Sequence, residues 1–183
     1  ELIFYYSGHG NNGEATKEPY LLPVDITGKN IRLGISLTEL YRELATYPVK
    51  GAYVFLDACF SGGYKSAAPL LAQKGVRVVP KVGLPQGKTL SFSSSSGDQT
   101  SSVYHDKKQG YYTYFLIKTI KDARGDLSMK DLFERTSAAV KKATAMIGKM
   151  QEPQCMVSPT WFGWESLRLE TPVEPAPVAP QGE

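Results

Sequence analysis

Gly51-Ala52-Tyr53-Val54-Phe55-Leu56-Asp57 is apolar from its second residue to its sixth, with no polar residue between the hydrophobic ones. Continuous β-prone runs of this kind are typical of strands that are covered on both faces, as in parallel sheets. Leu2-Ile3-Phe4-Tyr5-Tyr6 has the same character, and Thr89-Leu90-Ser91-Phe92-Ser93 is a third predicted strand. The three runs together predict a sheet whose strands are buried.

Segments with helical spacing separate these strands. Helices are predicted from a Ser36 or Thr38 cap to Leu44, over residues 110–121, and from a Ser128 cap to about residue 146. A last strand is predicted over residues 155–157. Strands that alternate with helices indicate an α/β fold, here a three-layer α/β/α sandwich with a mostly parallel sheet. In such sheets, functional sites form in the loops at the carboxyl ends of the strands.

The composition indicates one globular domain. Of the 183 residues, 42% are hydrophobic and 21% charged, and 21 basic against 18 acidic residues leave a net charge of +3. This small basic excess argues against a nucleic-acid or membrane partner, and no apolar run reaches the roughly 18 residues of a membrane-spanning helix. We expect a folded core over residues 1–170 and a proline-rich tail or linker over residues 171–183.

Two turn-forming segments follow the first two predicted strands. One is Ser7-Gly8-His9-Gly10-Asn11-Asn12-Gly13, and the other is Ala58-Cys59-Phe60-Ser61-Gly62-Gly63. A histidine alone in a loop is usually a surface residue, and a cysteine after a buried strand is more often a small core residue. The joint pattern is more specific, since His9 and Cys59 follow two strands about 50 residues apart.

The pair has the chemistry of a thiol peptidase. A free cysteine is mostly protonated near neutral pH, so a nearby imidazole has to take its proton before the sulfur can attack a carbonyl carbon. His9 is therefore the candidate general base and Cys59 the candidate nucleophile. The glycines that flank His9 are expected to let the substrate backbone approach closely. The backbone N–H groups of Gly10 and Cys59 are candidates for the oxyanion hole.

The two motifs resemble those of a known family. Tyr6-Ser7-Gly8-His9-Gly10 and Asp57-Ala58-Cys59-Phe60-Ser61-Gly62 are similar to the histidine and cysteine motifs of the caspase–metacaspase superfamily, especially its bacterial and metacaspase-like branches. The resemblance covers nearly everything from Glu1 to about Leu169, and it implies a caspase-like fold and a cysteine endopeptidase that acts on a protein or peptide substrate. Further segments agree in order: residues 21–25, 95–101, 110–114 and 151–154.

The resemblance also implies a substrate preference. In metacaspase-like members, the acidic residue two positions before the cysteine lines the S1 pocket and pairs with arginine or lysine at P1, which assigns that role to Asp57. Ser7 and Asp98 are further candidates for the same pocket. A carboxylate there would favour a basic P1 side chain and repel an acidic one. The alternative for Asp57 is a strand-end carboxylate that caps backbone amides.

No metal or cofactor is expected. Some metacaspases bind calcium through several aspartates, but the residues after Asp25 are not acidic, and two cysteines and two histidines do not form a zinc set. His105 is expected to be a surface residue. A nucleophilic Cys59 must stay reduced, which argues against a disulfide with Cys155.

The superfamily fold places two strands and a helix before the histidine motif, which here begins near the first residue. Without those strands, the apolar edge and faces of Leu2 to Tyr6 would be exposed. We therefore expect this part of the domain as a partner, either a separate chain or another segment. The weakly patterned stretch 64–88, with a short strand predicted at Val76–Val79, carries candidate self-processing sites of a zymogen: Lys65, Lys74, Arg77, Lys81 and Lys88.

Two other functions remain open at this stage. A caspase-like module without activity would act as a scaffold or regulator, although such modules often lose one residue of the dyad. Transpeptidation is the other, because a thioester formed on Cys59 can pass to an amine as well as to water.

Overall fold

The computed structural model describes residues 1–13, 18–26, 28–60, 83–96 and 99–169. No helix within these ranges is both long and apolar enough to cross a lipid bilayer. The predicted strand at Val76–Val79 and the proline-rich tail at 171–183 lie outside the described residues.

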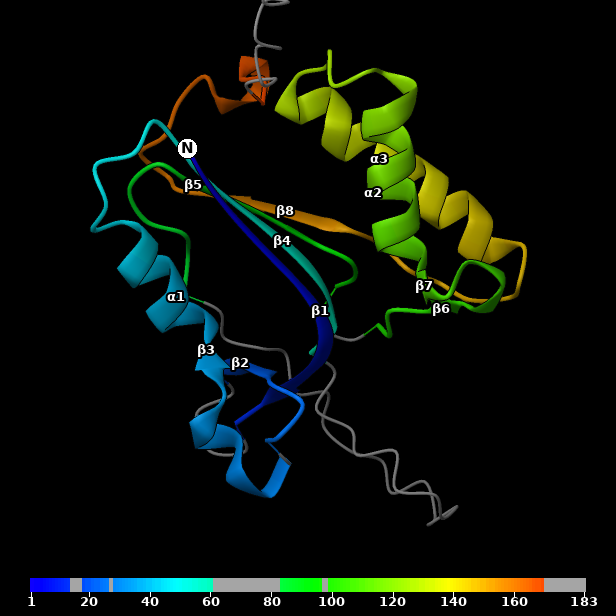
Figure 1. Ribbon diagram of the computed structural model, residues 1–183, viewed down its shortest axis with the longest axis horizontal. Coiled ribbons are helices and arrows are strands. Elements are labelled where there is room, and N and C mark those ends of the chain that lie inside the picture. The colour runs from blue at the N-terminus through cyan, green and yellow to red at the C-terminus, as the bar shows by residue number, and fades with distance from the viewer. Residues whose placement is uncertain (14–17, 27, 61–82, 97–98, 170–183) are drawn as a thin grey trace, which may run out of the picture.

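A six-stranded sheet forms the centre of the fold, in the order β3-β2-β1-β4-β5-β8 (Figure 1). Its three longest strands, β1, β4 and β5, lie side by side and run parallel. The shorter outer strands pair antiparallel, so the predicted mostly parallel sheet is confirmed as a mixed sheet with a parallel centre. The strands are β1 (Leu2–Asn12), β2 (Pro19–Leu22), β3 (Ile35–Ser36), β4 (Ala52–Cys59), β5 (Thr89–Ser93) and β8 (Gln154–Val157).

Three α-helices cover the sheet: α1 (Leu37–Leu44), α2 (Tyr111–Asp122) and α3 (Met129–Ala145). The predicted caps are confirmed for two of them, since the Ser36 hydroxyl accepts from the Glu39 N–H and the Ser128 hydroxyl from the Asp131 N–H. A small hairpin of β6 (Val103–Tyr104) and β7 (Gln109–Gly110) leads into α2. Short 3-10 helices lie at Gly28–Leu33, His105–Lys107 and Trp164–Ser166.

The two faces of the sheet carry separate cores. Tyr53 and Phe55 of β4 pack in a cluster with α2 and α3, whereas Val54 and Leu56 pack in a second cluster with α1. This division follows from the alternation of side chains along a strand. Figure 1 shows α1 on one side of the sheet and α2 and α3 on the other. The predicted three-layer α/β/α architecture is therefore confirmed.

The strand β1 is longer than its apolar run. It continues through the histidine motif to Asn12, so the loop predicted over residues 7–13 is wrong. The reason is tertiary pairing: Leu2 to His9 pair with β4, and His9 to Asn12 pair with β2. Cys59 is likewise the last residue of β4 rather than a loop residue. Pairing on both sides overrides the turn preference of Gly and Asn.

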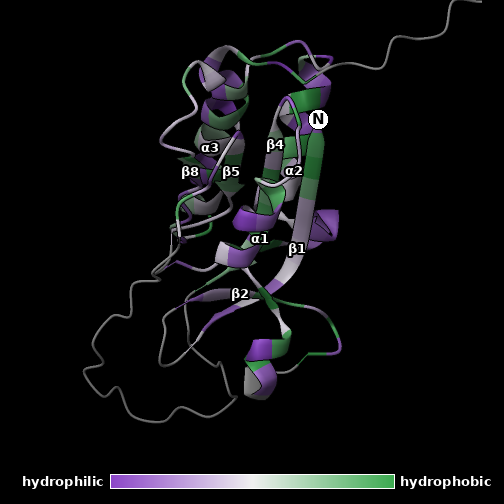
Figure 2. Cartoon of the chain, turned by 90° about the vertical axis from the view of Figure 1, so that its left-hand side faces the viewer, coloured by the Kyte–Doolittle hydropathy of each residue, from purple (hydrophilic) through white to green (hydrophobic). Residues whose placement is uncertain are grey.

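The first half of β1 has an open edge. Because β2 pairs with β1 only from His9 onward, Leu2 to Gly8 have β4 as their one strand partner among the described residues. Ile3 is 61% and Tyr5 48% exposed, and Figure 2 shows this half of the strand as hydrophobic. The apolar run Leu2 to Tyr6 was predicted to be buried on both faces, and this burial does not occur in this chain. The exposure expected for the run without the preceding strands is confirmed.

Candidate active site

The parallel pairing of β1 with β4 brings the two candidate catalytic residues to the same level of the sheet. His9 and Cys59 are direct partners in the ladder. Partners in a parallel ladder project to the same face, and neighbouring strands lie about 4.8 Å apart. Cys59 lies four residues after Phe55 and therefore projects to the face covered by α2 and α3. The imidazole is exposed and the thiol half-buried, so a solvent-borne substrate has access to both.

The sulfur of Cys59 is held by a backbone group that sequence reasoning missed. The Ser101 N–H donates to Sγ at an N···S distance of 2.8 Å, and the thiol donates to the Ser101 carbonyl oxygen (3.7 Å). Ser101 belongs to the loop between β5 and β6, whose start is tied to β4 by a bond from the Ser94 hydroxyl to the Ala58 carbonyl (3.2 Å). An N–H donor aimed at sulfur stabilises negative charge there.

The end of β1 fixes the chain just after the nucleophile. Asn12 is 6% exposed, and its side-chain amide donates to the Phe60 carbonyl. A Cβ at Gly10 would lie 2.7 Å from both the Cys59 carbonyl oxygen and the Phe60 ring. Contacts within the protein therefore favour a glycine at position 10, and the expected close approach of a substrate backbone stays a prediction. Gly10 lies within β1 opposite Leu21, and its oxyanion role stays a prediction.

Asp57 lies beneath the amino end of α2. It is 5% exposed, and its Oδ2 accepts from the Thr113 hydroxyl (2.6 Å) and from the Thr113 N–H (3.1 Å). Thr113 in turn bonds the hydroxyl of Tyr5 (2.8 Å), which reaches the surface from β1. Asp57 thus caps the helix, as the alternative interpretation proposed, and its charge lies at the end where a helix favours an anion. The S1 role remains a prediction.

The close contact between Asp57 and Gly110 leads to a stability prediction. A Cβ at position 110 would lie 2.1 Å from Asp57 Oδ2, which is too close for two atoms that are not bonded to each other. Gly110→Ala should therefore displace the carboxylate or the helix end and lower the free energy of unfolding by about 2 kcal/mol, as expected for overpacking. Urea denaturation measures this loss. In an Asp57→Ala background, Gly110→Ala should lower the free energy of unfolding much less. An equal loss would show that the added methyl group clashes with atoms other than the Asp57 carboxylate.

Burial raises the pKa of the Asp57 carboxyl above its ordinary value of 3.8, and hydrogen bonds from Thr113 and Ser94 offset part of this effect. The folded protein therefore keeps this proton at pH values where the unfolded chain has released it. The contribution to stability is full below about pH 3.8 and falls as the pH rises through the folded pKa.

The pH dependence of stability should reveal this shift. The free energy of unfolding of the wild type minus that of Asp57→Asn should decrease as pH rises from about 4 and become constant above the folded pKa. Urea denaturation of both proteins between pH 4 and 8 measures the difference. A difference that grows with pH would mean that the carboxylate form is the one favoured by folding, contrary to the burial argument.

The remaining predicted site residues are not all brought together. Ser7 is exposed and is the ladder partner of Asp57, so it lies beside that carboxylate on the same face. Asp98 lies outside the described residues. Asp25 is exposed in a turn, and no group of three or more His, Cys, Asp or Glu within the described ranges is placed to hold a metal ion.

The second cysteine and the second histidine belong to other elements than the two candidate catalytic residues. Cys155 is in β8, unpaired like Cys59, and burial raises the pKa of its thiol to about 12. His105 is exposed in the 3-10 helix after β6, as predicted. Of the proposed processing sites, Lys65, Lys74, Arg77 and Lys81 are outside the described residues. The Lys88 carbonyl accepts from the Ala52 N–H (2.8 Å), which ties that peptide into the sheet.

The caspase domain family matches this chain over residues 2–160. The chain belongs to this family of cysteine peptidases. The predicted resemblance is thus confirmed, and the caspase domain spans both the His9 strand and the Cys59 strand. No curated protein sequence matches the chain significantly.

A solved structure has the same fold. The crystal structure of a Geobacter sulfurreducens protein, from a structural genomics programme, is similar with a TM-score of 0.58 and 18% sequence identity. The match covers 91% of this chain and 69% of the other. At this identity the likeness concerns the fold of the caspase domain and carries no statement about substrate.

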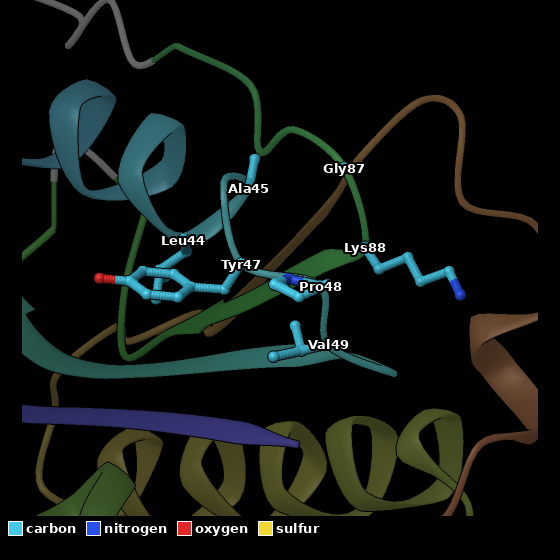
Figure 3. A pocket seen from close by; sticks show the side chains of 7 residues that line it. All are labelled: Leu44, Ala45, Tyr47, Pro48, Val49, Gly87 and Lys88. Carbon is cyan, nitrogen blue, oxygen red and sulfur yellow. The ribbon is translucent and has the colours of Figure 1, made fainter.

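The hollow in Figure 3 is not part of this site. It has a volume of about 410 Å³ and is lined by the end of α1, by Tyr47, Pro48 and Val49, and by Gly87 and Lys88. Val49 and Lys88 precede β4 and β5, so the hollow lies at the amino ends of the parallel strands. Cys59 is at the opposite, carboxyl end, as expected for sites in this class of sheet.

Proposed function

We propose that this caspase domain is a cysteine endopeptidase with His9 as general base and Cys59 as nucleophile. The observation that supports it most is the ladder pairing of these two residues on one face of adjacent parallel strands. The N–H of Ser101 supports it further, because this donor lies against the sulfur that would become a thiolate.

The reaction follows from the two groups. His9 takes the thiol proton of Cys59, and the thiolate sulfur attacks the carbonyl carbon of the scissile peptide. The backbone N–H groups of Gly10 and Cys59 would bind the oxyanion, each being worth roughly 3 kcal/mol of barrier. The imidazolium then gives its proton to the leaving amine, and water hydrolyses the thioester that remains on Cys59.

We further propose specificity for arginine or lysine at P1. Asp57 lies on the same face as Cys59 and two residues before it, with Ser7 beside it in the next strand. A carboxylate with this little exposure attracts a cation strongly once water is displaced. Thr113 donates twice to Oδ2 and Ser94 also donates to the carboxyl, so we propose that the substrate cation shares the carboxylate with these donors.

The open edge of β1 suits a strand of the same protein as partner. In the part of the chain that the structure describes, Leu2 to Gly8 have no strand on that side, and the apolar side chains of Ile3 and Tyr5 are exposed next to it. Such an edge is a template for strand addition. Self-processing within residues 64–88 is a related proposal; cleavage after Lys88 is the least favoured of the five, because its carbonyl is bonded in the sheet.

The test is hydrolysis of short reporter peptides with arginine, lysine, aspartate or glutamine at P1. We expect cleavage after arginine and lysine only, because Asp57 repels an acidic side chain. Preference for aspartate would overturn the S1 assignment. Absence of cleavage from all four peptides would favour a scaffold or regulatory module, and transfer of the acyl group to an added amine in place of water would indicate a transpeptidase.

A further inference from the structure

One buried side chain fastens both ends of the loop that follows β5. Gln151 is 1% exposed, and its amide nitrogen donates to the Ser94 carbonyl oxygen (3.0 Å). Its amide oxygen accepts from the Ser102 N–H (2.9 Å). The next residue takes part as well, because the Glu152 N–H donates to the side-chain oxygen of Gln99 (2.7 Å). The segment before β8 therefore holds the loop at its start, near its middle and at its end.

The same loop ends carry the contacts to the nucleophile. Ser101, whose N–H donates to the Cys59 sulfur, is one peptide unit before Ser102. The Ser102 carbonyl accepts from the Tyr111 N–H at the start of α2 (3.0 Å), which fixes the following peptide unit, between Ser102 and Val103. Ser94 and Ser101 also bond each other through their hydroxyls. The direction of the Ser101 N–H therefore depends on where Ser102 is held.

We propose that Gln151 is a positioning residue for the nucleophile, which holds Ser94 and Ser102 so that the Ser101 N–H is aimed at the Cys59 sulfur and stabilises its thiolate. The proposal rests on the proposed cysteine peptidase function and adds a residue to it. A donor to sulfur bonds a thiolate more strongly than a thiol. The benefit is largest when the donor is held in place beforehand, because it then needs no reorganisation during the reaction.

The physical basis is the burial of a doubly bonded carboxamide. A buried polar side chain that satisfies two backbone groups fixes their geometry, since the loss of either bond leaves an unpaired group in the protein interior. Gln154, three residues later, offers a contrast. It is exposed, and its amide donates to the Glu152 carbonyl (2.9 Å) without contact to the loop.

The test measures the rate at which iodoacetamide alkylates Cys59 at neutral pH, mapped by peptide mass spectrometry. Gln151→Met keeps the volume and removes both hydrogen bonds, and we expect the rate to fall about tenfold, the loss of roughly one bond to a charged group. Gln151→Glu can still accept from Ser102 but, as the ionised carboxylate, has no donor for Ser94, so its rate should lie in between. Gln154→Met should alkylate as the wild type does. Cys155 is the unreactive internal control, because its raised pKa leaves almost no thiolate at neutral pH.

A wild-type or faster rate in folded Gln151→Met would overturn the proposal. If Gln151→Met fails to fold, Gln151→Glu decides, and a rate equal to that of Gln154→Met would then overturn it. The alkylation rate needs no peptide substrate, so it is separate from the test of function. The two tests can therefore give different answers. If the Gln151 variants are alkylated slowly but the wild type cleaves no peptide, the peptidase assignment is wrong and the positioning role of Gln151 still holds.

Discussion

Cys59→Ala is expected to reduce cleavage of arginine reporter peptides to background, and His9→Ala to lower kcat/KM about a thousandfold. The first variant removes the atom that forms the thioester, and the second removes the base that ionises it. Neither residue belongs to either of the two hydrophobic core clusters, so neither change removes a core contact. Thermal melting of both variants should stay close to that of the wild type.

The sequence itself supplies matched controls, since it has two cysteines and two histidines. Cys155→Ala removes a sulfur packed in the core beside β5 and should lower stability by about 1 kcal/mol without lowering kcat/KM. His105→Ala changes an exposed side chain and should alter neither. Loss of activity in a control variant, or retained activity in Cys59→Ala, would contradict the assignment of the dyad.

The double His9→Ala, Cys59→Ala variant should be no less active than Cys59→Ala alone. Groups that act as one unit lose their effect together, so their separate losses do not add. A further loss in the double variant would show that His9 also acts independently of the sulfur.

The centre of the fold was predictable because local patterns and tertiary structure agree there. The apolar run before Asp57 is β4, and the serine caps at positions 36 and 128 start α1 and α3 as expected. The course of β1 was not predictable in the same way. Ser, Gly and Asn around His9 are turn formers, and only the partners β2 and β4 extend the strand through them.

The same distinction holds for the site. His9 and Cys59 were identifiable because each follows an apolar run at the end where sites form in parallel sheets. The residues that hold them carry no such signal. Gln151 lies in the polar stretch Gln151-Glu152-Pro153-Gln154, which agrees with the family only as a segment, and its burial depends on contacts with residues about 50 positions away. Thr113 meets Asp57 across 56 positions. Long-range bonds of this kind have no periodicity that a single sequence displays.

Asp57→Asn is expected to lower the preference for arginine over glutamine at P1 about 100-fold. The change removes the charge that would pair with the substrate cation, and an ion pair shielded from water is worth several kcal/mol to the partner it selects. Asparagine keeps an oxygen that accepts from Thr113, so α2 should remain capped and the protein folded. The measurement is kcat/KM for two peptides that differ only at P1.

Thr113→Val separates the two roles of the carboxylate. It removes the hydroxyl bond to Oδ2 and leaves the negative charge, so we expect about 1 kcal/mol less stability and an unchanged preference for arginine. If Asp57→Asn instead kept the full preference for arginine while both variants lost stability alike, Asp57 would serve only as the cap of α2. The cation would then have to be recognised elsewhere on this face. Asp57 is only 5% exposed, so burial alone is compatible with either role. A larger loss of arginine preference in Asp57→Asn than in Thr113→Val indicates a substrate-binding carboxylate, and equal preference with reduced stability indicates a purely structural one.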